Sequence, residues 1–98
     1  MSTSANIYVG EEQFYVTYDG YPEGVIPVLK EIVQEAREVS KKTGRGLLRE
    51  LIMLLNDDEW IAPGFVRYPS YEYEIGPRGG VYLLRNGKKT YPRIRGEL

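Results

Sequence analysis

Residues 81–91, VYLLRNGKKTY, contain the strongest structural signal in this chain. The dipeptide Asn86-Gly87 separates two short runs of strand-forming residues, and it favours a type I′ turn because both central residues of that turn take positive φ. A two-residue loop fixes the pairing, so Arg85 should face Lys88 and Tyr82 should face Tyr91. The segment therefore predicts a β-hairpin near the C-terminus.

This register gives the predicted hairpin two different faces. One carries Tyr82, Leu84, Lys89 and Tyr91, and the other carries Val81, Leu83, Arg85, Lys88 and Thr90. An isolated hairpin is marginal in water, so the rest of the chain must bury at least one face. Two alternatives stay open: the tyrosines pack on helices while the cations keep an exposed edge soluble, or tyrosines and cations together bind a partner.

Upstream of the hairpin, residue patterning predicts strands, then two helices, then strands. Alternating apolar residues over 7–9 and 14–18 indicate a hairpin joined through residues 10–13. Helical spacing predicts one amphipathic helix from about Gly24 to Gly44, with Pro27 in its first turn. A second helix over residues 47–56 should be largely buried, and residues 65–68 and 71–75 should form strands.

The element order β-β-α-α-β-β-β predicts an α+β fold. We expect an antiparallel sheet of short strands with both helices packed on one face. The 98 residues suffice for one hydrophobic core, so residues 1–98 should form a single domain. No apolar run is long enough to span a bilayer and no signal peptide is evident, which predicts a cytoplasmic protein that does not act at a membrane.

The amino-acid composition excludes several common kinds of metal site and catalytic group. The chain has no Cys and no His, which removes disulfides, the usual zinc sites and the commonest general base. We therefore expect no metal, no cofactor and no enzymatic activity. The catalytic alternative would depend on carboxylates, of which the candidates are Asp19, Glu23, Asp57, Asp58 and Glu59.

Charge is distributed unevenly along the chain. Up to Pro77 there are seven Lys or Arg and thirteen Asp or Glu, whereas the remainder has six basic residues and one acid. Such a basic segment can dock on nucleic acid or an acidic protein, or attract the acidic body of its own fold. The candidate residues for binding nucleic acid or an acidic partner are Arg78, Tyr82, Arg85, Lys88, Lys89, Tyr91, Arg93 and Arg95.

Two segments resemble families of mobile elements. The sequences GPRGGVY at 76–82 and NGKKTY at 86–91 resemble the small basic adaptor module of large DNA viruses and some phage proteins, although Leu83 replaces a usual Tyr. This resemblance implies an adaptor role towards nucleic acid or virion components. About the first 40 residues resemble small phage and plasmid proteins with a His-Trp-Asp-Gly-Tyr-Pro segment, here Thr17-Tyr18-Asp19-Gly20-Tyr21-Pro22. That resemblance implies a strand, turn and helix opening, and the family's His is absent.

Two further clusters have local explanations. In the turn at residues 19–22, Asp19 should bond to the backbone and Gly20 should take a left-handed conformation. Asp57, Asp58 and Glu59 follow the second helix, where Asp57 or Asp58 should cap a short turn leading to Trp60, which we expect in the core. Pairing of these acids with the chain's own basic hairpin, or with a basic partner, is the alternative. Tyr68, Tyr71 and Tyr73 should give a strand one aromatic face, a candidate surface for protein interaction or a homodimer.

These observations together predict a small non-enzymatic accessory protein of a virus or mobile element. Its basic C-terminal hairpin would bind nucleic acid or an acidic surface. The alternative is a protein interaction module or inhibitor of a host protein, which would act through the acidic body or the Tyr-rich strands.

Overall fold

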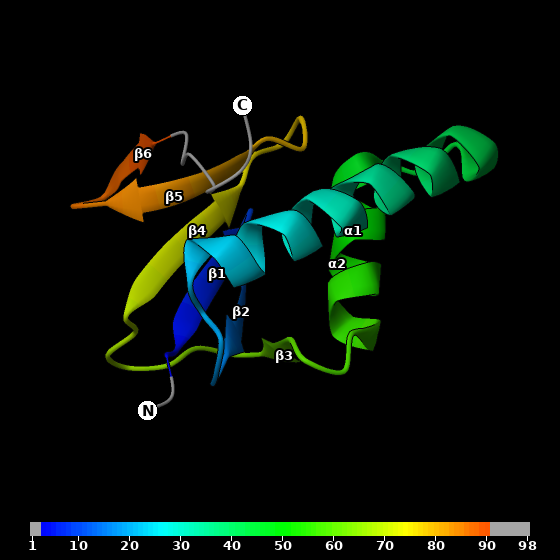
Figure 1. Ribbon diagram of the computed structural model, residues 1–98. Helices are drawn as coiled ribbons and strands as arrows, with labels where there is room; N and C mark the ends of the chain where they lie inside the picture. The colour runs from blue at the N-terminus through cyan, green and yellow to red at the C-terminus, as the bar shows by residue number, and fades with distance from the viewer. Residues whose placement is uncertain (1–2, 91–98) are drawn as a thin grey trace.

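A computed structural model describes residues 3–90 and contains one six-stranded sheet with two helices on one of its faces (Figure 1). The sheet order is β3-β2-β1-β4-β5-β6. The α+β fold and the predicted element order are confirmed, with one additional short strand, β3. The elements are β1 (Ala5–Val9), β2 (Glu12–Val16), α1 (Pro22–Thr43), α2 (Leu47–Asp57), β3 (Ala62–Pro63), β4 (Tyr71–Ile75), β5 (Val81–Arg85) and β6 (Lys88–Thr90).

The N-terminal hairpin forms two of the six strands of the sheet. β1 and β2 pair antiparallel, and Val9 faces Glu12. The connection is a two-residue turn, Gly10-Glu11, which is shorter than predicted and uses a positive φ of 61° at Gly10. The side chains that alternate on these strands, Ala5, Ile7, Val9, Phe14 and Val16, are at most 1% exposed and face the helices.

The pairing of β1 with β4 contradicts the expected antiparallel sheet. These two strands run parallel, with Ala5 facing Tyr71 and Val9 facing Ile75, so the sheet is mixed. The reason is the route of the chain, because β3 runs antiparallel to β2 and residues 64–70 then cross to the far side of β1. The crossing ends where β1 begins, since the backbone N–H of Ser70 donates to the carbonyl of Ser4 (3.0 Å).

Asn6 holds this crossing segment in place. Its side-chain amide donates to the carbonyl of Val66 (2.9 Å) and its Oδ1 accepts from the Val66 N–H (2.7 Å). Asn6 is 3% exposed, so these bonds satisfy a buried amide. The predicted strand at residues 65–68 is therefore wrong: this backbone bonds to a side chain, and Phe65 and Tyr68 lie exposed in a loop.

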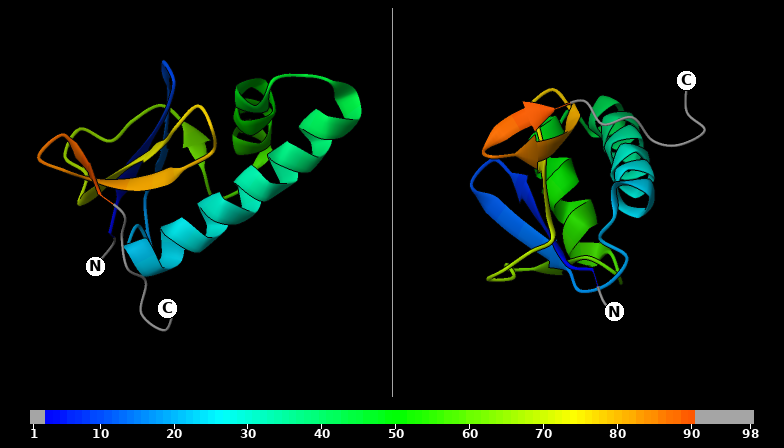
Figure 2. Two further views of the ribbon diagram at one scale, coloured as in Figure 1. Left: turned by 90° about the horizontal axis from the view of Figure 1, so that it is seen from above. Right: turned by 60° about the vertical axis from the view of Figure 1, so that its left-hand side comes forward.

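Helix α1 crosses the sheet diagonally and continues beyond it to pack against α2 (Figure 2). It ends as predicted at Gly44, whose φ is 75° and whose N–H donates to the Ser40 carbonyl (2.9 Å). It begins earlier than predicted, at Pro22, because the Tyr21 carbonyl already accepts from the Gly24 and Val25 N–H groups. The placement of Pro27 in the first turn is therefore wrong, and Pro27 instead lies in the second turn on the exposed face.

The turn before α1 is tied to the middle of the sheet. Gly20 donates its N–H to the Thr3 carbonyl (2.8 Å) and accepts the hydroxyl of Tyr73 on its own carbonyl (2.7 Å). Asp19, not Gly20, takes the left-handed conformation, with φ 54°, which corrects the prediction. Gly20 is required for space, because a Cβ there would lie 2.7 Å from the Thr3 carbonyl oxygen.

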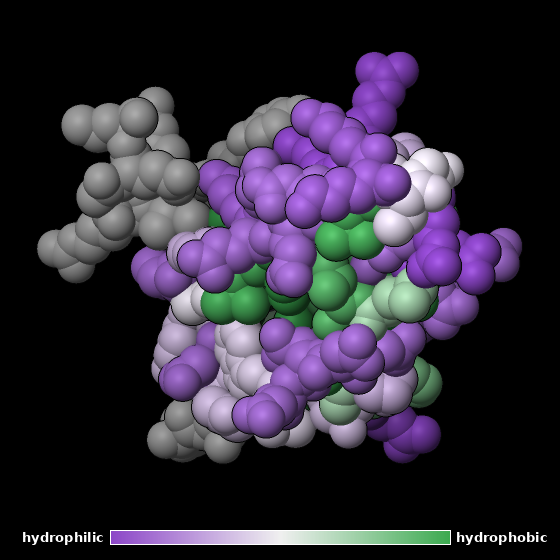
Figure 3. Space-filling view, turned by 90° about the vertical axis from the view of Figure 1, so that its right-hand side faces the viewer, coloured by the Kyte–Doolittle hydropathy of each residue, from purple (hydrophilic) through white to green (hydrophobic). Residues whose placement is uncertain are grey.

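Helix α2 is less buried than its apolar sequence predicts. Leu48 and Met53 are 37% and 44% exposed, and Figure 3 shows apolar residues forming a band on this side of the molecule. The expectation of a largely buried helix is wrong because α2 packs mainly against α1, which covers one side of it. Neither helix combines the length and apolar character needed to cross a membrane within residues 3–90.

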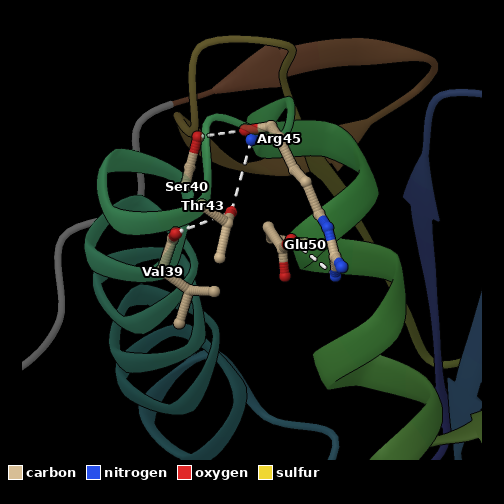
Figure 4. A network of polar contacts seen from close by, with 5 residues as sticks. All are labelled: Val39, Ser40, Thr43, Arg45 and Glu50. Atoms are coloured by element: carbon tan, nitrogen blue, oxygen red, sulfur yellow. Dashed lines mark hydrogen bonds and ion pairs between the residues drawn. The ribbon is translucent and has the colours of Figure 1, made fainter.

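Glu50 is buried on α2 with little compensation. Its side chain is 5% exposed, and its Oε1 lies 3.8 Å from Arg45 Nη1 with no hydrogen-bond partner among residues 3–90. Figure 4 shows the surrounding connection, in which the Ser40 hydroxyl donates to the Arg45 carbonyl and the Arg45 N–H donates to Thr43 Oγ1. These hydrogen bonds between side chains and the Arg45 backbone hold Arg45 in a position from which its guanidinium forms the ion pair with Glu50.

Replacing Tyr73 by Phe tests the bond between sheet and turn. The substitution leaves the buried carbonyl of Gly20 without its donor, so the free energy of unfolding should fall by about 1–3 kcal/mol. Tyr15→Phe is the matched control, since Tyr15 is half-buried and its hydroxyl forms no hydrogen bond within residues 3–90, and its effect should stay within about 0.5 kcal/mol. Urea denaturation measures both, and equal losses would contradict the assignment.

The stability difference between wild type and Tyr73→Phe should also depend on pH in the alkaline range. Burial, then the nearby Tyr71 and Glu23, raise the pKa of Tyr73 above its ordinary value. The unfolded chain releases this proton near pH 10 while the folded chain retains it, so stability falls as pH rises above about 10. The stability difference between wild type and Tyr73→Phe should therefore shrink between about pH 9 and pH 11. A difference that stays constant over that range would rule out this linkage.

A double-mutant cycle tests the ion pair between the half-exposed Arg45 and the buried Glu50. Glu50→Met removes a desolvated charge and should leave stability unchanged or raise it by about 1–2 kcal/mol. Arg45→Met should destabilise the wild type, because Glu50 then loses its cation, and should have no effect in the Glu50→Met background. Urea denaturation of the four proteins gives the coupling. Additive effects would show that the pair contributes nothing.

Candidate nucleic-acid interface

The C-terminal hairpin forms with the predicted register. Arg85 faces Lys88 and Leu84 faces Lys89, and the turn residues Asn86 and Gly87 have φ of 52° and 77°. The predicted pairing of Tyr82 with Tyr91 lies outside the described residues, as do Arg93 and Arg95. The hairpin is therefore confirmed as far as Thr90.

The face of the hairpin that packs on the helices is not the one that carries Tyr82. Val81 and Leu83 face the helices and are 8% and 4% exposed. Tyr82 lies on the opposite face, so the expectation that it packs on the helices is wrong. There, Lys89 Nζ lies 5.1 Å from the centroid of the Tyr82 ring and 2.7 Å from Glu74 Oε2. The cation of Lys89 is thus balanced by the protein's own acid.

Arg85 and Lys88 have a different environment at the tip. Both are exposed, and neither forms an ion pair within residues 3–90. Two like charges directly opposite on neighbouring strands repel each other, which is unfavourable for folding alone. An anion bound between them would relieve this repulsion.

The start of β4 supplies an aromatic ring beside this tip. Glu72 faces Leu84 and the strands run antiparallel, so the next pair places Tyr71 opposite Arg85. Tyr71, Arg85 and Lys88 therefore occupy neighbouring positions on three adjacent strands and on the same face; we call these three residues the tip row. Tyr71 and Arg85 also line one hollow of about 350 Å³, together with Pro69, Ser70, Glu72, Leu83 and Leu84.

The three predicted tyrosines do not form one surface. Tyr68 is 84% exposed on the crossing loop, whereas Tyr73 is fully buried. Tyr71 is half-buried, with its ring 6.3 Å from Tyr21 and 6.4 Å from Tyr73 between centroids. Only the ring of Tyr71 thus joins the cations at the tip, and Tyr21 supports it.

Glu72 lies in the strand position next to the tip row but points to the other sheet face. Its carboxylate accepts the hydroxyl of Tyr8 there. Burial, followed by this hydrogen bond and the charge of Glu72, raises the pKa of Tyr8. Both groups are consequently engaged with each other on the face that the helices leave uncovered.

Arg78 does not belong to the tip row. It lies in the turn between β4 and β5, at the opposite end of β5 from Arg85, and its carbonyl accepts from Arg37 Nη2 (2.8 Å). The basic residues predicted as one patch are therefore divided between the two ends of β5. Sequence reasoning also missed Arg37 and Tyr21, whose helical and turn positions carried no signal that they would meet these strands.

The acidic cluster after α2 is partly explained by capping, as predicted. Asp58 Oδ1 accepts the N–H groups of Trp60 (2.8 Å) and Ile61 (3.1 Å). Trp60 is half-buried, and its indole N–H donates to the Tyr18 carbonyl (3.1 Å). Residues 3–90 contain no group of three or more acidic side chains placed to hold a metal ion.

Comparison of the chain with protein-family models, with curated proteins and with solved structures finds no match to any of them.

Proposed function

We propose that this chain is a small non-enzymatic accessory protein of a virus or other mobile element that binds single-stranded nucleic acid at the tip row. The observation that carries this proposal is the pair of exposed cations, Arg85 and Lys88, beside the ring of Tyr71 on the same sheet face. The resemblance of residues 76–91 to a viral basic adaptor module supports the setting.

The chemistry of single-stranded nucleic acid fits this arrangement. Phosphates are bound by Lys and Arg with release of counterions, and bases stack on aromatic rings. A strand lying across the hairpin tip would meet Arg85 and Lys88 with its phosphates and Tyr71 with a base. The carboxylate of the adjacent Glu72 is directed away from this row, because it accepts the hydroxyl of Tyr8 on the other face.

Charge reversal at the tip tests the electrostatic half of the proposal. Arg85→Glu combined with Lys88→Glu should weaken binding of a labelled single-stranded oligonucleotide, measured by fluorescence anisotropy. Two lost phosphate contacts should reduce the slope of log K against log salt by about 1.4. Lys42→Glu with Arg49→Glu changes the net charge equally at exposed positions on the two helices and should leave the slope unchanged.

Two results would contradict this proposal. One is undetectable binding of wild-type protein to DNA and RNA at low salt. The other is an equal loss in the control pair, because binding would then follow net charge and not the tip row. Both variants should first give wild-type circular dichroism.

Tyr71→Leu tests the stacking half. The loss of one stacked base should weaken binding by about 1–3 kcal/mol and leave the salt slope intact, since no charge changes. The thermal melt of the variant should be recorded, because Tyr71 contacts Tyr21 and Tyr73. Wild-type affinity in a folded Tyr71→Leu protein would remove the aromatic ring from the interface.

A second candidate function, protein interaction, is favoured by the exposed aromatics of the crossing loop. Phe65 and Tyr68 are 65% and 84% exposed, and an aromatic surface of this kind suits a host protein or a second copy of the chain. Light scattering tests the homodimer version: a dimer mass that Phe65→Ser with Tyr68→Ser converts to a monomer would support it. A monomer at high wild-type concentration would exclude it.

A further inference from the structure

Trp60 is anchored beside the end of β2 by hydrogen bonds to its backbone and to its side chain. Asp58 Oδ1 accepts the Trp60 backbone N–H (2.8 Å), and the indole N–H donates to the Tyr18 carbonyl (3.1 Å). The two segments meet because β2 and β3 run antiparallel, so that residues which follow β2 lie beside residues which precede β3 (Figure 1). The indole ring is therefore held in one place, next to the ring of Tyr18.

The rings of Tyr18 and Trp60 form two walls of a hollow of about 290 Å³. Their centroids are 6.3 Å apart and their planes are inclined by 54°, so the rings do not stack on each other. Tyr18 is 53% exposed and Trp60 is half-buried, which leaves part of each ring open to solvent. The remaining lining residues are Asp19, Gly24 and Val28.

The position of Asp19 follows from a close contact between its turn and α1. Gly24 lies in the first turn of α1, and a Cβ there would lie 2.9 Å from the Asp19 carbonyl oxygen, so glycine is needed for this contact. Asp19 has φ 54°, a left-handed conformation that Asp adopts more readily than most residues. Its side-chain carboxylate is exposed and forms no hydrogen bond or ion pair within residues 3–90. The hollow therefore contains one unpaired carboxylate.

The charges around the hollow are negative. No Lys or Arg of the described residues lines it. The exposed acids Glu23 and Glu59 are the chain neighbours of two lining residues, Gly24 and Trp60. A cation that enters the hollow thus meets carboxylates and no competing cation in the lining.

Two aromatic rings and a carboxylate suit a guanidinium. The faces of Trp and Tyr rings attract a cation that lies within about 6 Å of the ring centre, and Trp does so most strongly. The planar guanidinium of arginine can stack on a ring and donate to a carboxylate at the same time, whereas the ammonium of lysine is compact and strongly hydrated. Arginine is therefore the side chain that uses all three groups.

The openness of the hollow indicates that its ligand belongs to a larger molecule. More than half of the Tyr18 surface remains exposed, whereas pockets for small molecules bury most of the ligand surface. A free cation would keep much of its surface in water here. An arginine on a protein segment gains further contacts outside the hollow.

We propose that the hollow formed by Tyr18, Asp19 and Trp60 binds an arginine side chain of a partner protein. The partner presents this arginine on an exposed basic segment, which the negative charges of Glu23 and Glu59 attract. None of the lining residues belongs to the tip row or to the crossing loop, so this site does not depend on either function proposed above.

The test uses Trp60 as the reporter. It is the only tryptophan of the chain, so its fluorescence emission and its indole N–H signal report on the hollow directly. The full chain is titrated with the blocked peptide Gly-Gly-Arg-Gly-Gly at constant ionic strength, and both signals should change in a saturable way. The same peptide with citrulline, which has the shape of arginine without its charge, should cause little change. Absence of a saturable change with the arginine peptide, or an equal change with citrulline, would overturn the proposal.

Two substitutions of Tyr18 test the aromatic wall. Tyr18→Leu removes the ring but keeps the backbone carbonyl that accepts from Trp60, so it should weaken peptide binding about twofold to fivefold. Tyr18→Phe keeps the ring and should bind as wild type. Circular dichroism checks that both variants fold. Wild-type affinity in a folded Tyr18→Leu protein would overturn the site.

A matched pair of substitutions tests the carboxylate. Asp19→Asn removes the charge and suits the left-handed position, because Asn also adopts it readily. It should weaken peptide binding about twofold to fivefold. Glu11→Gln removes an exposed negative charge at the other end of β2 and should bind as wild type. Equal weakening by both would overturn the site, because binding would then follow net charge.

Two further measurements separate the source of the cation. Tetramethylammonium carries a charge without a planar guanidinium or a peptide, and it should bind more weakly than the arginine peptide. Equal or tighter binding would assign the hollow to small organic cations and overturn the protein partner. Trp60 emission that changes with protein concentration alone, and that Asp19→Asn makes constant, would assign the hollow to a second copy of the chain and overturn it as well.

Discussion

The parallel pairing of β1 with β4 is the constraint on which the rest of the sheet depends. It joins strands that are separated in the chain by β2, both helices and β3, and it places β4 beside the N-terminal hairpin, with β5 next to β4. Asn6 supports this pairing, because its side-chain amide forms two hydrogen bonds with the Val66 backbone in the segment that crosses to the far side of β1. Tyr73 then connects the centre of the sheet to the turn before α1 through the Gly20 carbonyl. One ladder thereby positions the sheet, the crossing loop and the first helix.

The same pairing determines which part of the molecule the tip row lies beside. Because β4 runs parallel to β1, it begins beside Ser4 and Ala5, so Tyr71 lies close to Tyr21 in the turn that leads into α1. The antiparallel β5 ends at that same edge, and it brings Arg85 opposite the position of Tyr71. An antiparallel β4 would have reversed β5 and β6 with it, so Tyr71 would stay opposite Arg85 but would lose its contact with Tyr21.

Features governed by neighbouring residues could be predicted from the sequence. The Asn86-Gly87 turn, the helix stop at Gly44 and the capping role of Asp58 each depend on chemistry within a few residues, and all three are confirmed. Helix α1 begins before the expected start near Gly24, also for a local reason, because the Tyr21 carbonyl already accepts hydrogen bonds from the Gly24 and Val25 N–H groups.

Features that depend on distant partners could not be predicted in this way. No local pattern distinguishes a parallel from an antiparallel β4, and the exposed flank of α2 follows from which elements happen to cover it. The same limit applies to the site. Lys88 and Lys89 were both candidate binding residues in the sequence, yet Glu74 on β4, two strands away from β6, balances Lys89 and not Lys88. Likewise, Arg37 can donate its hydrogen bond to the Arg78 carbonyl only because α1 lies directly against Gly79 in the folded chain.

The most direct test is the direction of the β1–β4 ladder in solution. Inter-strand nuclear Overhauser effects between backbone protons of the isotope-labelled chain report it without substitution. The parallel pairing predicts contacts that link Ala5 to Tyr71, Ile7 to Tyr73 and Val9 to Ile75, so that the residue numbers increase in the same direction along both strands. Contacts that link Ala5 to Ile75 and Val9 to Tyr71 would show an antiparallel pair, and would move the tip row away from Tyr21 and the turn that leads into α1.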